Sequence, residues 1–206
     1  MNDNLDVKYR WSLVVRLLHW LTASLAVIQV ALAFTVLSGP GMTTVRWLPV
    51  HMSLGSAILA IVLIRISWRA FENAPVRPLA PTVRMIGSVV HACLYLLILT
   101  VAVTGWLAYR PSPLMRPVLL FGSIPMPIAP RYPPISPRSF ALVHYSLVWI
   151  FLGLVVVHVG AVLVHALVFR DGVLQGMLFG REIAQRNILE QRKPRSDAPG
   201  VGEGGP

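Results

Sequence analysis

The sequence has few charged residues and almost no cysteine. Only 13% of its 206 residues are charged, 55% are hydrophobic, and the single cysteine is Cys93. One cysteine excludes an intrachain disulfide framework and a zinc site built from paired cysteines. Because soluble domains carry about twice this fraction of charged residues, the composition favours a protein that sits in a membrane.

Four apolar stretches are long enough to cross a hydrocarbon layer, which takes about 20 residues of helix. They run over residues 14–37, 48–68, 85–109 and 140–169. The segments between them are rich in Gly and Pro and are predicted to be loops, the longest at 111–137. We therefore predict an all-α integral membrane protein, a four-transmembrane-helix bundle that occupies residues 1–178. Residues 179–206 are predicted to form a partly disordered cytoplasmic tail.

Charge is distributed unevenly between the two predicted sides of the bundle. With both termini inside, 13 of the 18 lysines and arginines fall on the inner side. This bias predicts that both termini of the multi-pass protein are cytoplasmic. All eight acidic residues also fall on the inner side. The outer side is therefore purely basic. This asymmetry could arise by chance on a short surface, or it could create an electrostatic field that attracts a small anion or an acidic partner. No nucleic-acid partner is expected.

All six histidines lie in the predicted spans: His19, His51, His91, His144, His158 and His165. Ionisable residues in a membrane are costly and usually face the bundle interior at a functional site. A lone histidine there is as often a hydrogen-bonding residue as a ligand, but six of them, with at least one on every span, indicate ligation. Neutral imidazole is a standard axial ligand of haem iron. Since the chain has no C-x-x-C-H segment, a haem would be held without thioether bonds.

Helical geometry sorts these histidines by depth. His144 and His158 are 14 residues apart, which corresponds to about 1,400° of rotation and about 21 Å of rise, so they share a face at two depths. With the termini inside, His51 lies at the outer level of His144, and His19 at the inner level of His158. Two bis-histidine sites stacked across the membrane are what two haems need.

His91 and His165 also lie toward the inner site. Their more common role would be to hydrogen bond a propionate, a ligand or a quinone headgroup. Spacing alone excludes neither of them as a ligand.

Gly55 and the inner arginines also suit a haem site. Gly55 could admit a flat macrocycle, although ordinary helix packing uses glycine in the same way. Arg16, Arg65 and Arg69 could pair with inner propionates, but the positive-inside bias explains them equally well.

Several motifs occur in order along the chain: Arg16-Leu-Leu-His19-Trp20, His51-Met-Ser-Leu-Gly55, His91-Ala-Cys-Leu-Tyr-Leu-Leu97 with Thr104-Gly-Trp-Leu107, and His158 to Leu174 through Arg170-Asp-Gly-Val-Leu174. With this combination the chain resembles the bacterial cytochrome b561 family, including its superoxide oxidase group. The similarity runs from about Tyr9 to Leu178.

The resemblance implies a four-helix cytochrome of the bacterial inner (cytoplasmic) membrane with two b haems. One haem would be ligated by residues matching His51 and His144, the other by residues matching His19 and His158. In the superoxide oxidase group, periplasmic superoxide gives an electron to the haems, which pass it to ubiquinone. The chain departs from the family in its longer C-terminal tail and in Ala166, where other members have a second histidine.

The sequence is compatible with three functions. The first is a superoxide:quinone oxidoreductase, in which Arg110 and Arg138 at the outer ends of the third and fourth spans guide the anion or hold propionates. The second is an electron-transfer subunit that serves a periplasmic cytochrome or a dehydrogenase and has no substrate chemistry of its own. The third, a proton or metal-ion transporter, is disfavoured because no span contains Asp or Glu.

Overall fold

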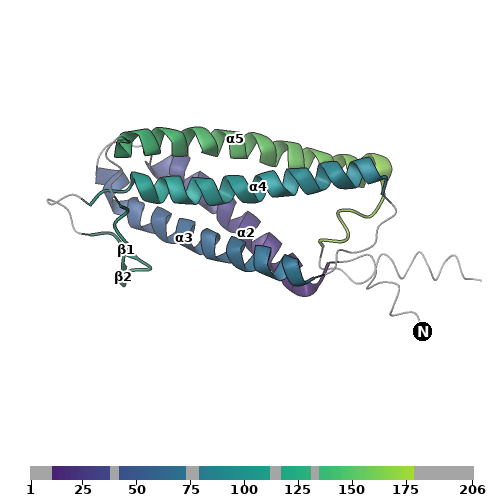
Figure 1. Ribbon diagram of the computed structural model, residues 1–206, viewed down its shortest axis with the longest axis horizontal. Helices are drawn as coiled ribbons and strands as arrows, with labels where there is room; N and C mark the ends of the chain where they lie inside the picture. The colour runs from purple at the N-terminus through teal and green to yellow at the C-terminus, as the bar shows by residue number, and fades with distance from the viewer. Residues whose placement is uncertain (1–10, 38–41, 73–78, 112–116, 131–134, 179–206) are drawn as a thin grey trace, which may run out of the picture.

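The computed structural model describes residues 11–37, 42–72, 79–111, 117–130 and 135–178. Four long helices lie side by side along the length of the molecule (Figure 1). The helical elements are α2 (Leu13–Leu32) with its π-helical continuation η1 (Ala33–Leu37), α3 (Met42–Phe71), α4 (Pro81–Ala108), and α5 (Pro137–Val164) with its continuation η2 (His165–Phe169). The predicted tail at 179–206 lies outside the described residues.

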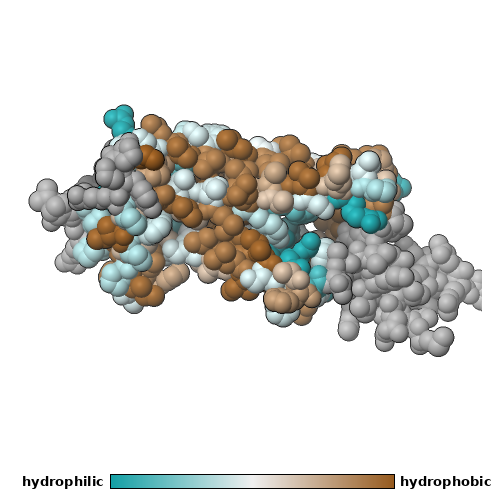
Figure 2. Space-filling model, viewed as in Figure 1, coloured by the Kyte–Doolittle hydropathy of each residue, from teal (hydrophilic) through white to brown (hydrophobic). Residues whose placement is uncertain are grey.

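Each of the four helices is long and apolar enough to cross a membrane. The candidate spans are Leu13–Thr35, Arg46–Phe71, Pro81–Ala108 and Pro137–Phe169. Figure 2 shows an apolar surface along the helices, with strongly hydrophilic residues toward their ends. No residue of α4 or α5 is fully buried in the protein, as expected of helices that face lipid. The predicted four-helix membrane fold is confirmed.

The helices extend beyond their apolar stretches. α4 begins at Pro81 rather than at residue 85, and α5 begins at Pro137 rather than at residue 140. Proline suits the first turn of a helix, where its missing N–H has no partner to lose. α3 also runs past both predicted ends and contains Pro49. The apolar stretches predict only the part of each helix that lies in hydrocarbon. They therefore miss the more polar first and last turns of the helices.

A short β-hairpin lies between α4 and α5, where the sequence predicts only loop, and for this part of 111–137 the prediction is wrong. β1 (Leu119–Leu120) pairs antiparallel with β2 (Ile124–Pro125). Between them Phe121 and Gly122 have φ angles of 50° and 74°, the left-handed conformations of a tight hairpin turn.

The β-hairpin is fastened to two helices. The Phe121 N–H donates to Ser53 Oγ of α3 at 2.9 Å, and Trp106 Nε1 of α4 donates to the Pro127 carbonyl at 2.8 Å. The hairpin therefore lies against the bundle near one end, which we call the hairpin end. The opposite end, where α2 begins and η2 ends, is the terminal end (Figure 1).

The four helices form two closely packed pairs. α2 packs mainly on α3 and α4 mainly on α5, whereas contact between α3 and α4 is sparser. The space between the two pairs is where a large group can be accommodated.

Candidate functional site

Four of the histidines lie in two facing pairs, one toward each end of the bundle. The ring centres of His51 on α3 and His144 on α5 are 6.3 Å apart, and those of His19 on α2 and His158 on α5 are 6.5 Å apart. An iron atom between two imidazoles separates the ring centres by roughly 6 Å, because each metal–nitrogen bond is about 2 Å long and each ring adds about 1 Å. The structure thus brings together the pairs expected from helical rise, at a separation that suits one iron each.

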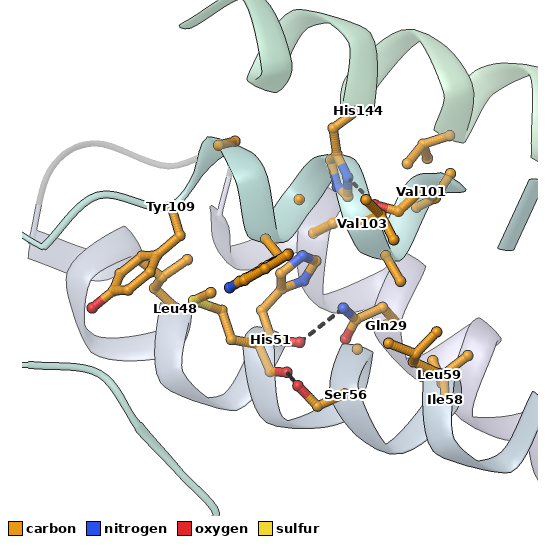
Figure 3. A pocket seen from close by; sticks show the side chains of 18 of the residues that line it. Gln29, Leu48, His51, Ser56, Ile58, Leu59, Val101, Val103, Tyr109 and His144 are labelled. Atoms are coloured by element: carbon orange, nitrogen blue, oxygen red, sulfur yellow. Dashed lines mark hydrogen bonds between the residues drawn. The ribbon is translucent and has the colours of Figure 1, made fainter. Parts of the chain in front are cut away.

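The His51–His144 pair faces a cavity of about 710 Å³, lined by all four helices and the β-hairpin. Figure 3 shows the two imidazoles pointing toward each other from α3 and α5. The wall is mainly aliphatic and aromatic, with a few polar residues that include Gln29, Ser56 and Arg110. A cavity of this size and lining suits a large, mostly apolar ligand that is held by a few polar groups.

The His144 imidazole is fixed by α4. Its Nδ1 lies 2.8 Å from the Val101 carbonyl oxygen (Figure 3). Because a carbonyl oxygen only accepts, Nδ1 carries the ring proton and Nε2 keeps the lone pair that can bind a metal. This close approach requires Gly105, since a Cβ at that position would lie 3.0 Å from two atoms of the His144 ring. Sequence reasoning gave Gly105 no role, because its importance depends on a neighbouring helix.

The His51 segment is held by α2. Gln29 Nε2 donates to the His51 carbonyl oxygen at 2.9 Å. A Cβ on Gly55 would lie 3.3 Å from Gln29 Nε2, so Gly55, which also lines the cavity, makes room for this glutamine. Sequence reasoning missed Gln29, because a single amide in an apolar span is also common in ordinary helix packing.

Two polar atoms at this pair have no partner. His51 Nδ1 and Gln29 Oε1 are buried and make no hydrogen bond within the described part of the chain. Buried polar atoms in native proteins are nearly always paired. Together with the close-packed Gly105 and the free Nε2 of His144, these unpaired atoms fit a site built for a large metal-containing group.

The terminal-end pair has two further neighbours. The ring centre of His91 lies 5.2 Å from that of His158, which is too short for an iron atom between them. His91 Nδ1 lies 2.6 Å from the Gly87 carbonyl oxygen of its own helix. Arg65 Nη2 lies 2.9 Å from His19 Nδ1. His91 therefore stands beside the His19–His158 pair and does not replace either member.

Arg16 and His165 at the terminal end make contacts with the segment after η2. Arg16 Nη1 donates to the Leu178 carbonyl oxygen at 2.8 Å. His165 Nδ1 is paired with the Asp171 carboxylate. The structure thus places Arg16 and His165 where they tie the end of the chain to the bundle, and it does not bring His165 into either histidine pair.

The two arginines predicted at the outer ends of the spans differ in position. Arg110 lines the hairpin-end cavity, and its guanidinium donates to the Tyr109 carbonyl oxygen at 2.8 Å. Arg138 is exposed and does not belong to the cavity wall. Only Arg110 is therefore placed to meet a molecule in the cavity.

Within the described residues, no group of three or more His, Cys, Asp or Glu side chains could hold a metal ion. Haem iron needs no such group, because the macrocycle supplies the equatorial ligands and the protein supplies axial ones. The fold and the site thus define a class of protein: a four-helix membrane bundle with paired histidines in its interior.

The family model of prokaryotic cytochrome b561 matches residues 10–180. A comparison with curated proteins found no match. The chain belongs to the prokaryotic cytochrome b561 family and is a multi-pass membrane protein that binds haem b and transfers electrons. The family predicted from the motifs is confirmed.

Proposed function

We propose that the protein is a di-haem b cytochrome that moves electrons across the bacterial inner membrane, from periplasmic superoxide to ubiquinone in the bilayer. The observation that carries this proposal is the presence of two facing histidine pairs, toward opposite ends of the bundle, with ring centres 6.3 and 6.5 Å apart. In this proposal the hairpin end faces the periplasm and the terminal end faces the cytoplasm, in agreement with the positive-inside bias.

His51 and His144 would hold the iron of the hairpin-end haem, and His19 and His158 that of the terminal-end haem. When bound, the haems supply reversible one-electron chemistry. The chain fixes the tautomer of His144 through the Val101 carbonyl, and a ligand that is oriented in this way binds its metal more tightly. His91 and Arg16 are proposed to assist at the terminal end by hydrogen bonding to the cofactor.

The hairpin end suits an anionic donor. Glu72 and Asp171, the two carboxylate residues in the described part of the chain, follow α3 and η2 and so lie at the terminal end. Arg110 reaches the cavity and Arg138 is exposed beyond it. Positive charge beside low-dielectric walls raises the rate at which a small anion arrives.

The electron balance is simple. Two superoxide ions each lose one electron and leave as dioxygen. One quinone accepts the two electrons and two protons to become quinol.

Reduced-minus-oxidised spectra with pyridine haemochrome quantitation test the ligand pairs. We expect two b haems per chain in the parent protein and the loss of chiefly one haem in each of His51→Ala and His158→Ala. His165→Ala is the matched control, because His165 lies in a span but in neither pair, and it should keep both haems. Retention of both haems in His51→Ala and His158→Ala would overturn the ligand assignment.

Superoxide consumption by the purified protein in the presence of ubiquinone tests the donor and the acceptor. We expect consumption that depends on quinone and is accompanied by quinol formation. A di-haem protein that leaves superoxide unconsumed would instead be an electron-transfer subunit that serves a periplasmic cytochrome or a dehydrogenase.

A further inference from the structure

Arg65 is a buried guanidinium inside a membrane span. Its residue is 8% exposed and lies within the Arg46–Phe71 span. Its contacts include His19 Nδ1, 2.9 Å from Nη2, and the face of the Tyr95 ring, whose centre is 5.3 Å from Cζ. Its Nε is buried and has no hydrogen-bond partner among the described residues. A charged arginine at this depth is costly unless it is paired.

Neither carboxylate in the described part of the chain pairs with this guanidinium. Glu72 accepts hydrogen bonds from Ser12 and from Trp68 Nε1. Asp171 is paired with His165. Arg65 therefore carries a buried positive charge without a described counter-ion, and this arrangement is strongly unfavourable until an anion arrives.

The contact between Arg65 and His19 cannot persist if His19 binds iron through Nε2. A guanidinium N–H only donates, so His19 Nδ1 accepts and the ring proton lies on Nε2. An imidazole with its proton on Nε2 cannot offer that nitrogen to a metal, and its Nδ1 is already occupied by Arg65. Filling the terminal-end site therefore releases Arg65 from His19, and the freed guanidinium needs a new acceptor.

We propose that this acceptor is a carboxylate of the cofactor itself, one of the propionates of the haem held by His19 and His158. The inference rests on the proposed di-haem function and assigns Arg65 as a positioning residue of that site. The planar fork of an arginine matches a carboxylate group. Because a nearby positive charge favours the form of the iron that has gained an electron, Arg65 also raises the midpoint potential of the terminal-end haem.

The test compares Arg65→Gln with Arg69→Gln in the haem-loaded protein. Arg69 is the matched control, because it lies one turn further along α3 and is exposed, with its guanidinium 4.0 Å from the centre of the Trp11 ring. Two readouts that do not depend on activity are used: potentiometric titration of both haems and the rate of haem loss to apomyoglobin. We expect Arg65→Gln to lower the midpoint potential of one haem and to speed its loss by about 10-fold or more. Arg69→Gln should leave the rate of haem loss unchanged and shift the potential much less, because the Arg69 charge is exposed and screened by solvent.

The outcomes separate this inference from the proposed function. If Arg65→Gln keeps two haems with the potentials and loss rates of the parent, the propionate assignment is wrong while the di-haem function stands. If the parent protein itself lacks two haems, the proposed function fails first. Where Arg65→Gln does not accumulate, Arg65→Lys replaces it. In Arg65→Lys, a near-parent potential with faster loss of one haem supports the propionate assignment, because lysine keeps the positive charge but lacks the planar fork of arginine. An unchanged rate of haem loss overturns the assignment.

Discussion

The position of the His144 imidazole depends on the absence of a side chain on α4. An added Cβ at Gly105 would lie 3.0 Å from two atoms of the ring, so Gly105→Ala should displace the imidazole and break its hydrogen bond to the Val101 carbonyl. Loss of such an orienting bond typically weakens metal binding by about 10- to 100-fold. We expect weakened or absent haem at the hairpin end and normal haem at the terminal end, measured by haemochrome quantitation and potentiometric titration.

Gly87→Ala is the control for this substitution, because a Cβ there would meet nothing within 4 Å on the same helix. It should keep two haems with the potentials of the parent. Equal haem content and equal potentials in the two variants would contradict the role assigned to Gly105.

The histidine pairs could be predicted from the sequence, whereas the residues that orient them could not. Rise per residue alone sets the depth of His51 and His144, because both lie near the start of spans that enter from the same side. Gln29 and Gly105 act across helix contacts, and a glutamine or a glycine in an apolar span gives no signal about its neighbour. The separation of the His91 and His158 rings also depends on helix packing and not on spacing along the chain.

Among the elements of the fold, the β-hairpin is held to α3 by a hydrogen bond to the Ser53 hydroxyl. Ser53→Ala removes the acceptor of the Phe121 N–H, at a cost of about 1 kcal/mol. We expect faster amide hydrogen exchange across residues 118–126, measured by mass spectrometry. Ser56→Ala is the control, because the Ser56 hydroxyl donates to the Met52 carbonyl oxygen in its own helix. The same exchange rates in both variants would show that Ser53 is not the anchor.

Sequence patterns predicted the helices much better than the hairpin. Long apolar runs determine where helices cross a membrane, because every backbone polar group there must bond within the helix. The hairpin lies in a proline-rich run, and proline is a strand breaker in most contexts. Proline is tolerated at a sheet edge, and each strand of a two-stranded hairpin is an edge, as the pairing of Pro125 with Leu119 shows.

For the molecule as a whole, the charge at the hairpin end should set the rate of reaction with an anion. Arg110→Gln removes the cavity-lining charge, and we expect superoxide oxidation to slow by about 2- to 10-fold at low salt, with a smaller difference at high salt. Arg138→Gln should matter less, because Arg138 lies off the cavity wall. Stopped-flow rates at several ionic strengths measure both effects, with Arg69→Gln at the opposite end as the control. A decrease in the rate that is the same at every salt concentration would argue against electrostatic steering by Arg110.

The two helix pairs also have a consequence for how the protein is assembled. The α2–α3 pair carries His19 and His51, and the α4–α5 pair carries His144 and His158. Each proposed iron therefore takes one ligand from each half of the chain and acts as a cross-link between the halves. Insertion of the cofactor and closure of the bundle then become one event, and two separately made polypeptides, divided between α3 and α4, are expected to associate stably only when haem is supplied.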